Sequence, residues 1–138
     1  MMVFVHGGGF VAGSADDWSY GAGFLVNDGV VVVSFNYRLG SFGFLSTGDS
    51  AAQGNWGMKD QVQALKWVQQ NIHKFGGNPD DVTIFGESAG SVSVNYLVIS
   101  PMAKGVSQIV VSFFLSQVSI SAFQKSNFGV WIVLGAMG

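Results

Sequence analysis

The sequence predicts an α/β fold with a mostly parallel sheet, and two observations carry that prediction. Strand-like apolar runs alternate with helix-like segments in the order strand, loop, strand, helix, strand, helix. Hydrophobic residues make up 49% of the 138 residues and charged residues only 10%. Such a composition suits parallel strands that are covered on both faces, so we expect near-continuous apolar runs in the strands.

Two strands are expected in the first third of the chain. Residues 1–5 form an apolar β-type run, and residues 30–37 begin with four consecutive valines. The second run is the strongest strand signal, and its length and apolarity predict a central strand buried on both faces. Between them lies a loop rich in Gly and Asp, which is compatible with a short helical turn at 20–26.

A glycine-rich connection at 39–55 leads into the clearest helix, predicted from about residue 56 to residue 75. Its apolar residues recur at three- and four-residue steps and form one buried stripe: Met58, Val62, Leu65, Val68, Ile72 and Phe75. Asn55 can cap the start of this helix, and Gly76-Gly77 gives a glycine-rich stop.

A serine lies in a strand–turn–helix context at residues 82–98. Residues 82–85 read Val-Thr-Ile-Phe and predict a buried strand, and residues 91–98 contain no Gly or Pro and can form a helix. Gly86-Glu87-Ser88-Ala89-Gly90 between them matches Gly-x-Ser-x-Gly. This context predicts a nucleophile elbow, in which a sharp turn presents the serine at a helix N-terminus. A chance match to so short a pattern is the competing interpretation.

A second motif, His6-Gly7-Gly8-Gly9, follows the first strand. Acyl transfer by a serine develops negative charge on the carbonyl oxygen, and backbone N–H groups can stabilise it. A glycine-rich loop of this type supplies such donors upstream of a nucleophile elbow, and the residue after the serine supplies another. The two motifs occur in the order that this chemistry requires, so together they favour a serine hydrolase.

With these motifs the sequence resembles the type-B carboxylesterase and cholinesterase family of α/β-hydrolases. The resemblance covers about residues 3–105 and rests on several further segments: Asn36 to Gly40, Gly43 to Leu45, Gly54 to Gln61, Trp67 to Ile72, Phe75 to Asp80, and Ser100 to Gly105. It implies a partial α/β-hydrolase fold with the elbow at 82–98. Since members of that family are several-fold longer, we expect an internal piece of such an enzyme.

The resemblance also implies roles for individual residues. Ser88 would be the nucleophile, and Gly8, Gly9 and Ala89 would donate the oxyanion-hole N–H groups. Glu87 would lie near the acyl pocket; the alternative is a solvent-facing charge at a helix start. The ring of Phe10 would line the pocket, although an ordinary core aromatic is equally compatible. Trp18 and Tyr20 are better explained as structural anchors than as substrate contacts.

The resemblance further implies that Arg38 and Asp60 pair inside the fold and hold strand to helix, which is a structural role. The catalytic triad is incomplete in this chain. A serine hydrolase of this class needs an acid and a histidine after the nucleophile. No Asp, Glu or His follows Ser88, and His6 and His73 both precede it. We therefore expect carboxylic ester hydrolase ancestry but poor or no activity of this polypeptide alone.

A non-catalytic, cholinesterase-like binding or adhesion protein is the alternative function. A dinucleotide-binding protein is disfavoured, since Gly7-x-Gly9-x-x-Ala12 is followed by helix-breaking residues. The expected partner is a small carboxylic ester, with no cofactor and no metal. A net charge of −2 argues against nucleic acid as a partner. The chain contains no cysteine. Its compartment is left open, because the family is often secreted but no secretory signal precedes the first strand.

Residues 106–138 differ in character from the rest of the chain. They hold a single charge, Lys125, and show no regular periodicity, although 109–115 and 130–134 are strand-like. A membrane span is not expected, because serines and glutamines interrupt the apolar run. We interpret residues 1–105 as the partial esterase domain and 106–138 as an atypical apolar tail produced by a retained intron or a shifted frame. An unusual splice form is the alternative. The abrupt start in a strand also suggests an incomplete N-terminus.

Overall fold

The computed structural model describes residues 1–16, 21–106 and 109–113, and the predictions for Trp18, Tyr20 and residues 114–138 lie outside these ranges. The described elements alternate between strands and helices, in the following chain order. They are β1 (Met2–Val5), α1 (Gly23–Asn27), β2 (Val32–Ser34), α2 (Gly40–Phe44), α3 (Trp56–Asn71), the 3-10 helix η1 (Ile72–Phe75), β3 (Thr83–Glu87), α4 (Ala89–Ile99), the 3-10 helix η2 (Pro101–Ala103) and β4 (Ile109–Phe113).

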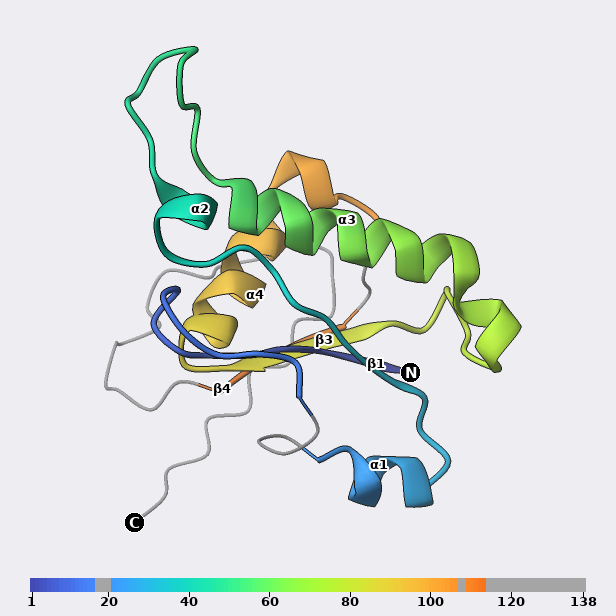
Figure 1. Ribbon diagram of the computed structural model, residues 1–138. Coiled ribbons are helices and arrows are strands. Elements are labelled where there is room, and N and C mark those ends of the chain that lie inside the picture. Colours follow the sequence, from blue (N-terminus) through green and yellow to red (C-terminus); the bar gives the residue numbers. More distant parts are fainter. Residues whose placement is uncertain (17–20, 107–108, 114–138) are drawn as a thin grey trace, which may run out of the picture.

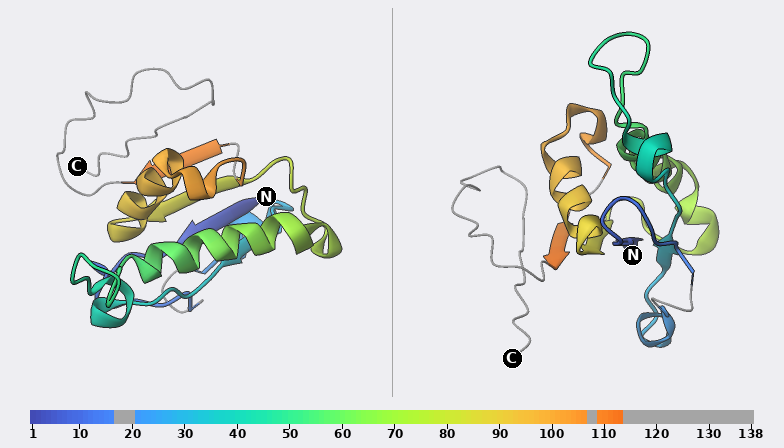
Figure 2. Two further views of the ribbon diagram at one scale, coloured as in Figure 1. Left: turned by 90° about the horizontal axis from the view of Figure 1, so that it is seen from above. Right: turned by 60° about the vertical axis from the view of Figure 1, so that its left-hand side comes forward.

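The strands form one sheet in the order β2-β1-β3-β4, and every neighbouring pair is parallel. The register places Val3 opposite Val33 on one side and opposite Ile84 on the other. Helices α3 and α4 cover one face of the sheet and α1 lies on the other (Figures 1 and 2). The predicted α/β class with a parallel sheet is confirmed.

The core lies between the sheet and helices α3 and α4. Val3 and Val5 of β1 and Ile84 of β3 are almost fully buried there. They pack against the apolar stripe of α3 and against α4, whose buried residues include Val62, Leu65, Val68, Val94 and Leu97. The predicted stripe is buried from Val62 to Ile72, whereas Met58 is only partly buried. The prediction is wrong for Phe75, which lies in η1 and is 61% exposed. Burial of each such side chain contributes about 1.5–3 kcal/mol to folding.

The prediction of a central strand at 30–37 is wrong in position and in length. Strand β2 spans only Val32–Ser34, is partly exposed, and lies at the edge of the described sheet. The ladder with β1 ends at the pair Phe4 and Ser34, one residue before β1 itself ends at Val5 and leads into the glycine motif. Beyond Ser34 the side chains bond to loops: Asn36 accepts from the Ala15 N–H, and Tyr37 donates to the His6 carbonyl.

The long helix begins at Trp56 as predicted, but two details differ. Its regular α-helical part ends at Asn71, and the last predicted turn is the 3-10 helix η1. Asn55 holds the N-cap position with φ of 57°, and its side chain makes no capping hydrogen bond. A left-handed residue cannot place its side chain over the first turn in the usual extended geometry of an N-cap. The preceding connection also contains α2, and its remainder projects from the body of the molecule (Figure 1).

The predicted pair of Arg38 and Asp60 forms, but not inside the fold. One Arg38 Nη lies 2.7 Å from an Asp60 carboxylate oxygen, and the two side chains are 49% and 27% exposed. Arg38 follows the end of the β2 segment at the carboxyl edge of the sheet, where solvent reaches it. The pair therefore joins strand to helix at the surface.

Strand β4, at residues 109–113, extends the sheet parallel to β3 and falls within the segment interpreted as an atypical tail. The strand-like run at 109–115 therefore forms a strand over the part that the structure describes, residues 109–113. The strand-like run at 130–134 lies outside the described residues. Among the described residues, no helix is long and apolar enough to cross a membrane.

Candidate active site

The Gly-x-Ser-x-Gly segment forms a tight strand-to-helix turn. Strand β3 ends at Glu87, α4 begins at Ala89, and Ser88 alone connects them with φ of 55° and ψ of −121°. A non-glycine residue in this region is strained and persists where the surroundings enforce it. The Ser88 side chain makes no capping hydrogen bond to α4, so its hydroxyl is not used by the helix.

Close packing against β1 explains the two glycines of the turn. A Cβ on Gly86 would lie 2.5 Å from the carbonyl carbon of Gly90 and 2.8 Å from the oxygen of Val5. A Cβ on Gly90 would overlap the same Val5 oxygen and lie 2.9 Å from the oxygen of His6. The turn therefore fits only because both residues lack a side chain. The elbow is fixed against the end of β1, where the second motif starts.

The second motif curls into a turn immediately after β1. The N–H groups of Val11 and Ala12 donate to the Gly8 carbonyl at 3.1 and 3.0 Å. Gly9 and Phe10, the central residues of this turn, both have positive φ, 62° and 64°, as in a type I′ turn. Gly8 itself has φ of 105°, and a Cβ there would overlap the Ala12 carbonyl.

The two motifs meet at Gly7. A Cβ on Gly7 would lie 3.1 Å from the Ser88 Cβ and 2.5 Å from the Glu87 Oε2. The glycine loop thus lies directly against the elbow, and the Glu87 carboxylate lies against the loop. Within the described residues, no hydrogen bond occupies the N–H groups of Gly8, Gly9 and Ala89. Free backbone donors next to a strained serine are what oxyanion stabilisation requires.

His6 is buried at the start of the loop. Its ring is 1% exposed and stacks on Tyr37 with the centroids 4.4 Å apart. Its Nδ1 lies 2.8 Å from the Gly7 carbonyl oxygen, while Nε2 has no hydrogen-bond partner among the described residues. The only other histidine, His73, is exposed in η1. His6 therefore belongs to the scaffold of the loop.

The loop after the glycines does not open a helix, because the next described helix begins at Gly23. A dinucleotide fingerprint must open one, so that alternative is unsupported. Phe10 is half-buried, and its ring packs edge-on against Phe44 with the centroids 5.1 Å apart. This contact agrees with the alternative of a packed aromatic for Phe10.

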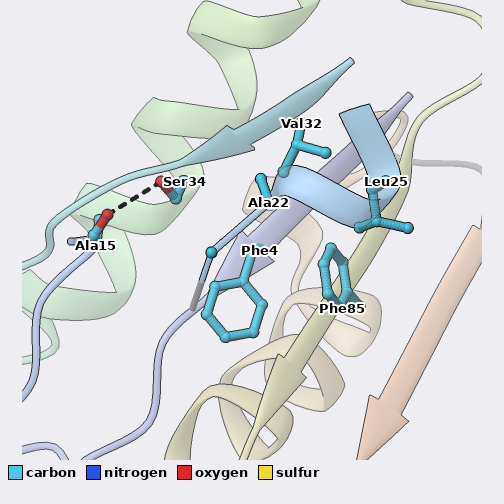
Figure 3. Close-up of a pocket in the computed structure, with 8 residues that line it drawn as sticks. Phe4, Ala15, Ala22, Leu25, Val32, Ser34 and Phe85 are labelled. Atoms are coloured by element: carbon cyan, nitrogen blue, oxygen red, sulfur yellow. Dashed lines mark hydrogen bonds between the residues drawn. The ribbon is translucent and has the colours of Figure 1, made fainter. Parts of the chain in front are cut away.

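A cavity of about 260 Å³ lies on the other side of the sheet, under α1. Phe4, Phe85 and Leu25 supply much of its apolar wall, and a bond from the Ser34 hydroxyl to the Ala15 carbonyl closes one end (Figure 3). It includes none of the predicted site residues, so it is separate from the elbow. No group of three metal-ligating side chains occurs in the described part of the chain.

Three glycines of the site carry no sequence-based assignment of their own. Gly7 lacks a Cβ that would collide with the elbow, and a Cβ on Gly13 would lie 2.5 Å from the Gly7 oxygen. The Gly40 N–H donates to the Phe10 carbonyl at 2.7 Å. The run of glycines signals close approach at Gly7. Nothing in the sequence signals that Gly40 bonds to Phe10, because this contact joins segments 30 residues apart.

A parallel sheet with a strand–serine–helix elbow and an adjoining glycine loop defines the α/β-hydrolase class of fold. The chain belongs to the carboxylesterase family: the sequence model described as "Carboxylesterase family" matches residues 1–130. Over 106 residues, 77% of this chain, it is 57% identical to carboxylesterase 1D of Mus musculus and 58% identical to cocaine esterase of Homo sapiens. Its structure resembles juvenile hormone esterase of Manduca sexta with OTFP covalently attached, with a TM-score of 0.78 and 47% identity over 80% of this chain.

The chain spans about a fifth of the length of these relatives: 19% of both mammalian enzymes and 21% of the insect esterase chain. The resemblance to this family of ester-hydrolysing enzymes, stated from the motifs, is confirmed. The family match extends beyond residue 105. The division of the chain at that residue, and the origin of residues 106–138, stay predictions.

Proposed function

We propose that this chain carries the nucleophile and oxyanion hole of a serine carboxylic ester hydrolase. The observation that carries the proposal is the contact between the two motifs, in which Gly7 lies against Ser88. The proposal is further supported by the unoccupied N–H groups of Gly8, Gly9 and Ala89 within the described residues. The substrate is a small carboxylic ester, as the names of the relatives suggest for the family.

In the proposed reaction the Ser88 Oγ attacks the ester carbonyl carbon, and the carbonyl oxygen becomes negatively charged. The N–H groups of Gly8, Gly9 and Ala89 donate to that oxygen, and each such donor is worth about 2.7–4 kcal/mol of barrier. Collapse of the intermediate breaks the bond between the carbonyl carbon and the alcohol oxygen. The alcohol leaves with the proton that the serine gave up, and an acyl group remains on Ser88. Ala89 is the first residue of α4, so the positive end of the helix adds to the stabilisation.

Glu87 is assigned to the substrate side of the site. Its carboxylate lies next to Gly7, within reach of the glycine loop, and brings negative charge close to Ser88. Phe10 stays a predicted pocket-lining residue, and the packing of its ring on Phe44 favours the alternative of an ordinary packed aromatic.

Turnover by this polypeptide alone is expected to be poor. A general base must take the proton of the serine and return it to the leaving group, and no Asp, Glu or His follows Ser88 in the sequence. The same observation favours a second candidate function, a non-catalytic binding or adhesion protein. The two candidates differ in whether Ser88 reacts.

Labelling with a fluorophosphonate, which modifies activated serines, separates the candidates. We expect slow labelling of the purified chain, because the oxyanion hole stabilises the transition state although no general base follows Ser88. Ser88→Ala should abolish this labelling, and Ser50→Ala, a control at an exposed loop serine, should leave it unchanged. Labelling that persists in Ser88→Ala would contradict the proposal. Absence of labelling in a chain whose circular dichroism shows a folded α/β protein would also contradict it and favour the binding protein.

A further inference from the structure

The turn at residues 8–11, which holds two of the proposed oxyanion donors, depends on an unusual conformation of Phe10. Phe10 occupies the second central position of the turn with φ of 64°. Glycine or asparagine normally fills such a position, because a bulky side chain disfavours positive φ. The turn will therefore keep this shape only where other contacts hold Phe10 in place.

Two contacts from one distant segment hold Phe10. The Gly40 N–H donates to the Phe10 carbonyl at 2.7 Å. The Phe44 ring packs edge-on against the Phe10 ring, with the centroids 5.1 Å apart and the planes at 64°. Gly40 and Phe44 are the first and last residues of α2, so a single short helix contacts both the backbone and the side chain of Phe10.

Helix α2 is itself held in place, because it packs on the start of α3. A Cβ on Gly57 would lie 2.5 Å from the Phe44 Cζ and 2.5 Å from the Arg38 carbonyl oxygen. A Cβ on Gly43 would overlap that same carbonyl. Phe44 therefore has little freedom to move away from Phe10.

We propose that Phe10 is a positioning residue, which α2 holds through Gly40 and Phe44 so that the Gly8 and Gly9 N–H groups face Ser88. This inference rests on the proposed function for its catalytic consequence. Phe10 acts through the backbone of the turn. A residue that lined the acyl pocket would instead act through contact with the substrate.

The two roles make different predictions for Phe44, which belongs to α2. Phe44→Ala removes the partner of the Phe10 ring and leaves the sequence of the loop unchanged. Phe42→Ala is the matched control, since Phe42 lies on the same helix and is 85% exposed. Phe10→Ala and the double variant complete a thermodynamic cycle, and Phe44→Leu serves if Phe44→Ala does not fold.

The first measurement is amide hydrogen exchange at Val11 and Ala12, whose N–H groups bond to the Gly8 carbonyl. We expect exchange at these amides to rise by about tenfold or more in Phe44→Ala and to stay unchanged in Phe42→Ala. The second is the rate of Ser88 modification by two fluorophosphonates, one with a short alkyl chain and one with a long chain. Phe44→Ala should slow both by the same factor, roughly tenfold, and the double variant should be little slower than either single variant.

Unchanged exchange at Val11 and Ala12 in a folded Phe44 variant would overturn the inference. So would a Phe10→Ala effect that depends on the length of the alkyl chain and is absent from the Phe44 variants. If the unsubstituted chain is not modified at all, the proposed function fails, whereas the exchange measurement still decides whether α2 positions the turn.

Discussion

Asp60 accepts three hydrogen bonds from Arg38. Arg38 Nε donates to Oδ2 and Nη2 to Oδ1, both at 2.7 Å, and the Arg38 backbone N–H donates to Oδ2 at 3.0 Å. The Arg38 carbonyl on the other side packs where Gly43 and Gly57 lack a Cβ. Arg38 therefore connects the segment after β2 to both α2 and α3. Helix α2 in turn contacts the glycine loop at Phe10.

The Arg38–Asp60 pair predicts an acid-sensitive part of the stability. Hydrogen bonds from the Arg38 guanidinium hold the pKa of Asp60 below its ordinary value of 3.8. Because the folded pKa is lower than the unfolded one, the contribution is complete above pH 3.8 and is lost as the pH falls through the folded value. Asp60→Asn should lower the free energy of unfolding at neutral pH and flatten its decline between about pH 5 and pH 2.

Urea denaturation across this pH range measures the effect. Asp28→Asn is the control, since Asp28 is exposed and forms no ion pair within the described residues. If the free energy of unfolding of Asp60→Asn fell as steeply with decreasing pH as that of the unsubstituted chain, the pair would contribute nothing measurable to stability.

Local patterns in the sequence predicted much of the fold. The elbow depends on neighbouring residues, so strand, turn and helix at 82–98 could be predicted together, and the stripe of α3 follows from its periodicity. Position within the sheet could not be predicted. Four valines suit a central strand, yet β2 lies at the edge of the described sheet, because β1 is its only described neighbour.

The same distinction applies to the candidate site. Ser88 and the glycines belong to compact motifs and were assigned from the sequence. Phe10 is held by Gly40 and Phe44, which follow it in the sequence by 30 positions or more. No sequence pattern links Phe10 to either residue. The exposure of Arg38 could not be predicted from the sequence either, because it depends on how the edge of the sheet meets solvent.

Gly90 should be among the least replaceable residues of the chain. Gly90→Ala would push a methyl group into the Val5 carbonyl, so it should destabilise the fold by about 1–3 kcal/mol or more. Gly23→Ala is the matched control, because a Cβ there meets nothing within 4 Å and alanine favours the helix by up to about 1 kcal/mol. Equal midpoints of thermal unfolding for the two variants would refute the close approach of α4 to β1.

Helices α3 and α4 share a buried polar contact. Gln61 Nε2 donates to the Ser93 Oγ at 3.0 Å, and both residues are 0% exposed. Ser93→Ala should cost about 1–3 kcal/mol, because it leaves the Gln61 amide without this partner. Replacing both partners, with Gln61→Met and Ser93→Ala, should recover most of the loss in chemical denaturation. A double variant less stable than Ser93→Ala alone would contradict this explanation.

The atypical composition of residues 106–138 leads to a prediction about the gene. If a retained intron or shifted frame produced this segment, genomic sequence should allow Gly105 to join directly to an esterase-like continuation with an acid and a histidine. A peptide from the native source that spans Gly105 and Val106, followed by the sequence as it stands, would contradict this origin.

The central claim is that the fold itself makes Ser88 reactive, and tandem mass spectrometry after fluorophosphonate treatment tests it most directly. We predict a single adduct on the peptide that contains Ser88, formed in native buffer and lost when the chain is first unfolded in urea. Modification spread over several serines, or equal modification of Ser88 with and without urea, would contradict the claim that the elbow and the glycine loop assemble an active nucleophile.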